Sequence, residues 1–364
     1  MILDRYFARR FLLIFAGVFF IFLLISGFVG LVDQLRRFSG ADATFGQIFR
    51  LSLLAVPQSI YGILPLIMII SAISLFLGLA RSSEMVVTRA AGRSALRALV
   101  PPATMALMIG LVAVAVLNPI VAATSRQYDI RANLLQGESP ILSLGETGLW
   151  LRQGDDTGQT VIRAAGANLG GTVLQDASFI TFAPSGGPIA RIDAATATLA
   201  DGAWQLRDAK RWPLAPDTTP EAQATTAATL SIPSTLTPDQ IRNSFGTPSS
   251  ISIWDLPAFI DRLRSAGFSA QRHTVWFQME AALPLFLVSM VMIGAAFTLR
   301  HQRGGRTGLA VLLAILLSFA LYFLRNFAQI LGENGDVPVT LAAWAPPLIA
   351  MGLAMGLLLH REEG

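Results

Sequence analysis

Six long runs of apolar residues divide this chain. A helix needs about 20 mostly apolar residues to cross the hydrocarbon core of a bilayer, and each run reaches or approaches that length. We therefore predict spanning helices over residues 11–31, 51–80, 98–124, 275–299, 308–324 and 339–359. The first run is too long for the apolar core of a signal peptide and has no convincing cleavage site before Asp33, so we expect a retained anchor.

The shortage of charged residues agrees with this prediction. Only 14% of the residues are charged, whereas soluble domains carry about 25%. A hydrophobic share of 53% also excludes a disordered chain, because disorder requires low hydrophobicity. The fold class that follows is an α-helical membrane protein with six transmembrane helices.

Residues 125–270 contain no such run and have a different pattern. Short stretches alternate between apolar and polar residues and are separated by turn signals, which is typical of a β sandwich, jelly roll or open barrel. The expected strands lie at residues 148–152, 160–163, 178–182, 189–193 and 203–207, with a loop at 213–228. Over residues 254–270 the periodicity becomes helical, with Asp255 as a candidate N-cap and an end at Gly267. The predicted layout is three spans, an inserted β domain with a returning helix, and three further spans, over residues 1–124, 125–270 and 271–364.

The distribution of arginine in the short loops predicts the orientation, because positively charged loops stay in the cytoplasm. Eleven arginines flank the run ends that share a side with the N-terminus, at positions 5, 9, 10, 81, 89, 93, 97, 300, 303, 306 and 361. Four flank the opposite ends, at positions 36, 37, 50 and 325. Both termini are therefore expected in the cytoplasm and the β domain outside, in the periplasm of a Gram-negative cell.

Several function classes are excluded by what the chain lacks. It has no cysteine, so thiolate metal sites and cysteine nucleophiles are impossible, and its three histidines lack metal-ligand spacing. Lys210 is the only lysine and does not follow a glycine, so a Walker A loop is absent. No Ser-His-Asp arrangement indicates an enzyme, and the basic residues do not cluster on one face as in nucleic-acid-binding proteins. We expect no cofactor on this chain and, if ATP is used, hydrolysis by a partner.

The connector between the second and third runs predicts a short amphipathic helix over residues 82–92. Glu84 falls in its first turn, where a negative charge is favoured, and Met85 and Arg89 fall on adjoining faces. Gly92 can end the helix in a left-handed conformation. A surface helix with one exposed acid suits the groove of a partner protein, and the alternative is an ordinary positively charged connector.

Four arginines are predicted at the outer ends of the first and third runs, namely Arg36, Arg37, Arg126 and Arg131. A guanidinium group pairs with phosphate through two hydrogen bonds, so a ring of them suits an anionic lipid head group. The alternative is that they only extend to the interface or pair locally with Asp33 or Asp129.

Glu280 is an acidic residue inside the fourth run. A charge buried there costs several kcal/mol unless it is paired or hydrated. The residue therefore indicates a cavity, a partner, or a carboxylate that reaches the outer interface.

Motifs along the whole chain carry a family resemblance. They are Leu3-Asp-Arg-Tyr6, Val32-Asp-Gln-Leu-Arg36, the stretch Ser83-Glu-Met-Val-Val-Thr-Arg-Ala-Ala-Gly92, Leu117-Asn-Pro119, Leu283-Pro284 and the Arg-rich turn before the fifth run. With these motifs the chain resembles the LptF/LptG (YjgP/YjgQ) family of permease subunits of the lipopolysaccharide-export ABC transporter. The stretch from Ser83 is the most specific, and Asp-Gln-Leu after the first run favours the G-type over the F-type paralogue.

The resemblance implies a function that composition alone does not give. Members of the family pair as an F–G heterodimer on two copies of the ATPase LptB and associate with LptC. They extract lipopolysaccharide from the inner membrane and pass it through β-jellyroll domains to a periplasmic bridge. Carried over to this chain, Glu84, Met85 and Arg89 belong to the coupling helix that docks in the ATPase.

The resemblance also gives the outer arginines a role. Arg36, Arg37, Arg126 and Arg131 fall near positions where basic residues contact the phosphates of the glycolipid. One position departs from the family pattern, because Gly30 stands where some members have a basic residue in the first span. The lipid contact at that point is therefore in doubt or is supplied elsewhere.

Two other classes of protein are alternatives, besides the F-type paralogue. One is a membrane-anchored scaffold whose β domain only binds partners, although six spans exceed what anchoring requires. The other is a membrane-embedded hydrolase, which the missing catalytic constellation disfavours. Recovery of an ATPase in stoichiometric amount with the purified protein separates transport from scaffolding.

Overall fold

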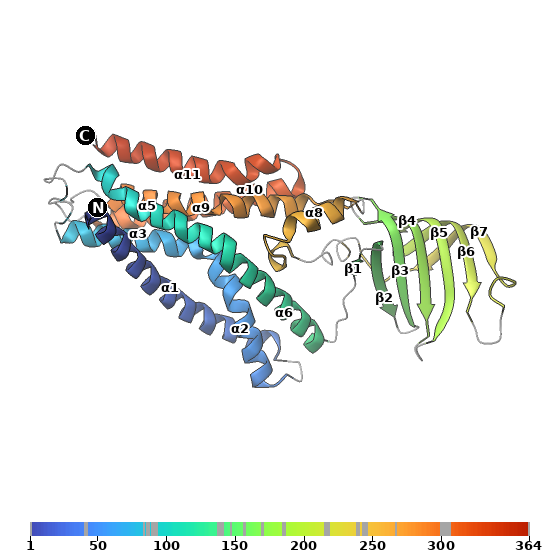
Figure 1. The fold of residues 1–364 in the computed structure, drawn as a ribbon. Coiled ribbons are helices and arrows are strands. Elements are labelled where there is room, and N and C mark those ends of the chain that lie inside the picture. The colour runs from blue at the N-terminus through green and yellow to red at the C-terminus, as the bar shows by residue number, and fades with distance from the viewer. Residues whose placement is uncertain are drawn as a thin grey trace. The chain divides into compact units, whose positions relative to one another are not determined.

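In the computed structural model the chain forms two compact units (Figure 1). The membrane unit comprises Met1–Leu135, Pro248–Leu256 and Gln271–Gly364, and the β unit comprises Gln136–Thr247 and Pro257–Ala270. The structure describes residues 2–39, 43–82, 84, 88, 94–136, 142–145, 148–155, 158–168, 171–183, 187–214, 219–237, 241, 247–265, 268–298 and 307–362.

Long apolar helices make up the membrane unit. They are α1 (Ile2–Arg37), α2 (Phe45–Gly62), α3 (Leu64–Arg81), α5 (Ala95–Val112), the π-helical stretch η1 (Ala113–Leu117), α6 (Asn118–Gln136), α9 (Gln271–Thr298), α10 (Thr307–Asn334) and α11 (Val339–Glu362). Among the described residues, six helical segments are long and apolar enough to cross a membrane: Ile2–Arg37, Leu64–Arg81, Leu96–Leu135, Gln271–Thr298, Gly308–Asn334 and Val339–His360. Three precede the β unit in sequence and three follow it.

Helix α9 forms the centre of the membrane unit, because α3, α5, α10 and α11 all pack against it. Its buried residues occupy every side of the helix, as expected of a helix enclosed by others. Glycine allows the closest approaches. A Cβ atom on Gly110 of α5 would lie 2.6 Å from the Cα atom of Pro284, and one on Gly294 would lie 2.8 Å from the Cβ atom of Ala72.

Helix α1 has the opposite character. Of its 36 residues, only Phe7, Phe11 and Gln34 are buried, and large side chains such as Phe20 and Phe28 are exposed. A continuous apolar surface of this kind requires lipid or another protein against it.

The second and third predicted spans differ from the observed helices in ways that affect the site, while the fifth continues ten residues past its predicted end as α10. The second breaks at Ile63, and the helix restarts just before Pro65, because proline is favoured at the first turn of a helix but not in its interior. Only α3 of the two resulting helices meets the criteria for a span. The third continues past residue 124 as α6 and ends at Gln136, after the π-helical stretch.

The β unit contains one antiparallel sheet of seven described strands (Figure 1). They are β1 (Leu142–Gly145), β2 (Gly148–Asp155), β3 (Gly158–Ala167), β4 (Val173–Phe182), β5 (Pro188–Ala200), β6 (Ala203–Pro213) and β7 (Thr225–Pro233). The strands pair in sequential order, whereas a jelly roll is built from two Greek keys. The described strands therefore establish the inserted β domain but not jelly-roll connectivity.

One face of this sheet carries its buried core. Alternate residues of β4 and β6 point inward, and the rings of Phe179 and Trp204 meet edge to face with centroids 6.1 Å apart. The five expected strands are all present but longer, and β7 begins inside the stretch expected to be a loop. The returning helix is α8 (Leu256–Ser265). Its expected end at Gly267 lies outside the described residues.

Candidate functional site

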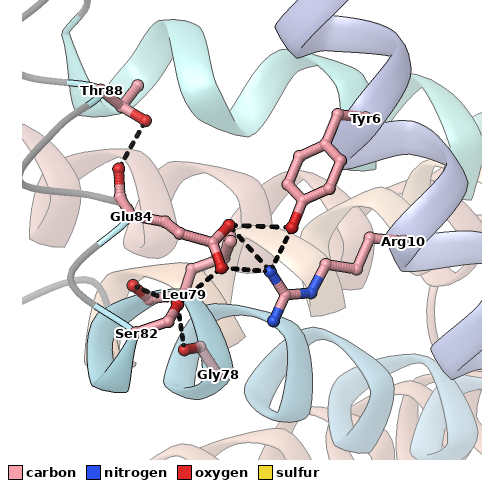
Figure 2. A network of polar contacts seen from close by, with 7 residues as sticks. All are labelled: Tyr6, Arg10, Gly78, Leu79, Ser82, Glu84 and Thr88. Atoms are coloured by element: carbon pink, nitrogen blue, oxygen red, sulfur yellow. Dashed lines mark hydrogen bonds and ion pairs between the residues drawn. The ribbon is translucent and has the colours of Figure 1, made fainter.

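A cluster of polar side chains surrounds Glu84, just after α3 (Figure 2). Arg10 of α1 donates from Nη1 to both carboxylate oxygens of Glu84, at 2.7 Å to Oε1 and 2.8 Å to Oε2. Tyr6 donates its hydroxyl to Oε2 at 3.0 Å. Ser82 Oγ lies 2.7 Å from Oε1. Three side chains of the same protein therefore contact the Glu84 carboxylate. We call Glu84 and the residues that contact it the Glu84 network.

The positions of Tyr6 and Arg10 in α1 explain why both reach Glu84. They are four residues apart and so share one face of the helix. Arg10 also donates to the Tyr6 hydroxyl at 2.7 Å, and its guanidinium carbon lies 5.7 Å from the centre of the Tyr6 ring. The two side chains thus form one preassembled donor pair.

The other side of the network closes the end of α3. Ser82 Oγ lies 3.0 Å from the carbonyl oxygen of Gly78, an acceptor one turn earlier. Thr88 donates its hydroxyl to the carbonyl oxygen of Glu84 at 2.7 Å. These contacts fix Glu84 at the beginning of the connector that follows α3.

The charge pair is intact at neutral pH. Burial raises the pKa of the Glu84 carboxyl, but the hydrogen bonds from Arg10, Ser82 and Tyr6 outweigh it and hold the pKa below its usual value of 4.5. A carboxyl whose pKa is lowered by folding contributes stability above its unfolded pKa and loses it as pH falls through the folded pKa. The network is therefore not a pH switch in the physiological range. The side chains of Arg10 and Glu84 are 29% and 32% exposed, so solvent screens the pair.

The acid expected to be exposed at position 84 is about a third exposed and has partners within its own chain. Met85, Arg89 and Gly92, predicted with Glu84 in one helix over residues 82–92, lie outside the described residues. Sequence reasoning missed Tyr6 and Arg10 as partners of Glu84. Their signal was the spacing of four residues in the first helix.

Two of the four outer arginines have contacts that the structure specifies. Arg37 at the end of α1 donates to the hydroxyl of Tyr128 in α6 at 3.2 Å, and Tyr128 donates to Gln34 at 3.0 Å. This chain of bonds joins α1 to α6, so Arg37 has a local partner. Arg36 and Arg126 are exposed on the same two helices.

Arg131 lies with Arg50, a residue that the site prediction did not include. The two arginines of α6 and α2 line an open hollow of about 190 Å³, together with Gln47, Leu51, Leu134 and Leu135. The lining thus combines two cationic side chains and an amide with three leucines. Arg50 entered the sequence analysis only as a marker of orientation, and nothing in its spacing indicated that it would meet Arg131.

Glu280 in α9 does not reach an interface, because it is 1% exposed. Its Oε2 atom accepts a hydrogen bond from the Tyr61 hydroxyl and one from the side-chain amide of Asn118 at 3.2 Å. Hydrogen-bond donors from α2 and α6 thus contact the buried carboxylate, an arrangement that the sequence did not indicate.

The described residues form a multi-pass helical membrane protein with a β sheet inserted in sequence between its third and fourth spans. Comparison with known sequences is specific. The profile of the lipopolysaccharide export system permease LptF/LptG matches residues 5–360, and the chain belongs to this family.

Relatives named lipopolysaccharide export system permease protein LptG match almost the whole chain. The protein of Haemophilus influenzae is 23% identical over 378 residues, covering 99% of both chains. The proteins of Escherichia coli K12 and of E. coli O6:H1 are each 27% identical over 358 residues, covering 96% of this chain and 93% of the relative.

Proposed function

We propose that the chain is the G-type permease subunit of a lipopolysaccharide exporter in the bacterial inner membrane. It binds the lipid and changes conformation, while a partner ATPase hydrolyses ATP. The observation that carries this proposal is the family match from residue 5 to residue 360, which includes both the helices and the inserted sheet. A jelly-roll role for the sheet, as the first part of the periplasmic path, belongs to the same proposal.

The exposed apolar helices support an F-type partner in a heterodimer. Helix α1 exposes most of its apolar side chains, and α10 exposes residues on one side, including Leu312, Leu316 and Phe323. Helix α9, by contrast, is already enclosed by its neighbours. A second permease subunit placed against α1 and α10 can cover these surfaces and leave a lipid-accessible space between the subunits.

The Glu84 network supports coupling to a dimeric LptB-type ATPase. In the proposed orientation it lies on the cytoplasmic side, where an ATPase can reach it. Because Arg10 and Tyr6 belong to α1, the network links the connector directly to the most exposed helix. We propose that movement of the connector during ATP hydrolysis reaches α1 through Glu84.

The decisive experiment is purification of the protein with its neighbours, followed by reconstitution. Transport predicts that an ATPase is recovered in stoichiometric amount and that lipopolysaccharide moves to a soluble LptC-type acceptor only with ATP. Recovery of periplasmic partners without an ATPase would favour the scaffold.

The hollow lined by Arg50 and Arg131 predicts where lipid phosphate binds. Replacing both arginines by Gln is expected to lower photocrosslinking of lipopolysaccharide at Leu134 by about tenfold, since each charge-assisted hydrogen bond contributes roughly 1.5–3 kcal/mol before solvent screening. The matched control is Arg5→Gln, which neutralises an arginine near the start of α1, outside the lining of the hollow. Equal crosslinking in all three proteins would mean that these arginines serve only as anchors.

The orientation can be tested with single cysteines, because the chain has none. Ala222 is exposed in the β unit, and Ser94 is exposed before α5. A membrane-impermeant maleimide is expected to label Ala222→Cys in cells with a permeabilised outer membrane and to spare Ser94→Cys until the inner membrane is opened. The reverse labelling would refute the arginine count and the proposed coupling side.

A further inference from the structure

The segment Pro248–Leu256, here named the strap, has an unusual place in the chain. It belongs to the membrane unit, although the residues on both sides of it belong to the β unit. The chain therefore leaves the β unit after Thr247, packs with the membrane helices and returns to the β unit at Pro257. Contacts with the helices must therefore keep this short segment in the membrane unit.

Two neighbouring donors of the strap bond to neighbouring parts of one helix. The backbone N–H of Ile253 donates to Oδ1 of Asn118 at 2.9 Å. The indole N–H of Trp254 donates to the carbonyl oxygen of Ala115 at 3.2 Å. A third contact lies nearby, where Gln58 donates to Ser249 at 3.4 Å.

Pro119 explains why the Ala115 carbonyl is available inside a helix. In an α-helix this oxygen would accept from the N–H of residue 119, but proline has none. The π-helical stretch Ala113–Leu117 directly precedes this position, and the Asn118 N–H bonds to the carbonyl of Ala113, five residues earlier. The Ala115 carbonyl oxygen therefore lacks its α-helical donor and accepts a hydrogen bond from the indole of Trp254.

Glu280 and Tyr61 explain why the Asn118 side chain has the correct orientation. An amide has a donating and an accepting end. The Nδ2 group of Asn118 faces the carboxylate of Glu280, which leaves Oδ1 to accept from Ile253. The hydroxyl of Tyr61 holds the same carboxylate oxygen. Asn118 is 3% exposed, so water does not replace these bonds.

We infer that the Asn118-Pro119 dipeptide is the docking site of the strap, and that Glu280 and Tyr61 are positioning residues for it. Asparagine supplies an oriented acceptor and proline frees a second one for the next residue of the strap. The strap thus docks the chain on the membrane helices between the two segments of the β unit.

The docking itself is tested by the reactivity of a cysteine at Ile253, which is 7% exposed. In the detergent-purified protein, Asn118→Leu is expected to raise the maleimide reaction rate of Ile253→Cys about tenfold, which corresponds to about 1.4 kcal/mol. Asn133→Leu in the same helix is the matched control and should leave the rate unchanged, and Ala222→Cys should react equally in every background. An unchanged rate in Asn118→Leu would overturn the inference.

A second variant covers the case in which Asn118→Leu does not fold. Trp254 is 68% exposed, so Trp254→Phe removes the indole donor without disturbing the core. It is expected to raise the reaction rate of Ile253→Cys about threefold, in line with the loss of a single hydrogen bond. No change with a folded Trp254→Phe protein would likewise contradict the docking site.

Discussion

Reversing the charge at residue 84 is expected to reduce ATP-driven lipopolysaccharide release by at least about tenfold, because 1.4 kcal/mol corresponds to a factor of ten. Glu84→Lys removes the acceptor of three donors and places an ammonium group beside Arg10. Since both side chains are about a third exposed, solvent screening limits the free energy contributed by the ion pair to about 1–2 kcal/mol. Repulsion between the new ammonium group and Arg10 adds to the loss. Release to a soluble acceptor in proteoliposomes is the measurement.

An exchange of the two charges separates two explanations of this loss. In the double variant Arg10→Glu with Glu84→Arg, the ion pair forms again with opposite polarity. If Glu84 acts by joining the connector to α1, release should recover to at least about half of the wild-type level, as expected for a coupled pair in a double-mutant cycle. If Glu84 instead contacts the ATPase directly, the double variant should be as inactive as Glu84→Lys. Recovery of the ATPase on purification tells loss of assembly from loss of coupling.

The packing of α5 on α9 should give the largest effect on stability. Gly110→Leu places a side chain where even a Cβ atom would lie 2.6 Å from the backbone of Pro284. Overpacking of a core costs about 1–3 kcal/mol and more where backbone must move, so we expect at least about 3 kcal/mol and a strongly reduced yield of folded protein. The melting temperature in detergent, followed by tryptophan fluorescence, is the measurement.

A matched glycine provides the control for that substitution. Gly352 lies in α11 of the same unit, and a Cβ atom added there would meet no other atom within 4 Å. Gly352→Leu should therefore melt at or slightly above the wild-type temperature, because leucine has a higher helix propensity than glycine. Similar losses in both variants would show that the close approach of α5 and α9 is not what limits stability.

Hydrophobic runs and alternation were sufficient to predict most of the architecture. The six apolar runs predicted the long helical segments, because a helix in lipid needs a long apolar stretch. The alternation over residues 148–207 predicted the inserted sheet, because burial of one face leaves a period of two in the sequence. The break at Ile63 was missed, since the run of apolar residues continues through it. Pro65 was the available signal, but proline also occurs inside the helices of this chain, as at Pro57 and Pro284.

The candidate site was only partly predictable. Glu84 was identified from its place in an amphipathic connector, but its partners come from a helix more than 70 residues earlier in the sequence. The same holds for Arg50 and Arg131, and for Glu280 and Asn118. Local spacing predicts which residues share one helix face, whereas the meeting of two helices depends on packing that a single sequence does not display.

The central position of α9 has a consequence for biosynthesis. Helices α3 and α5 leave the ribosome before the β unit, while α9, the helix they pack against, follows it. The first half of the membrane unit must therefore remain in the bilayer without its core partner until the whole β unit has been translated. Small residues on α3 and α5 that fit against α9, such as Ala72 and Gly110, face lipid or an insertion factor during that interval. A nascent chain that stalls within the β unit thus presents an unfinished helix interface, which is the kind of surface that membrane quality-control proteases can distinguish from the completed subunit.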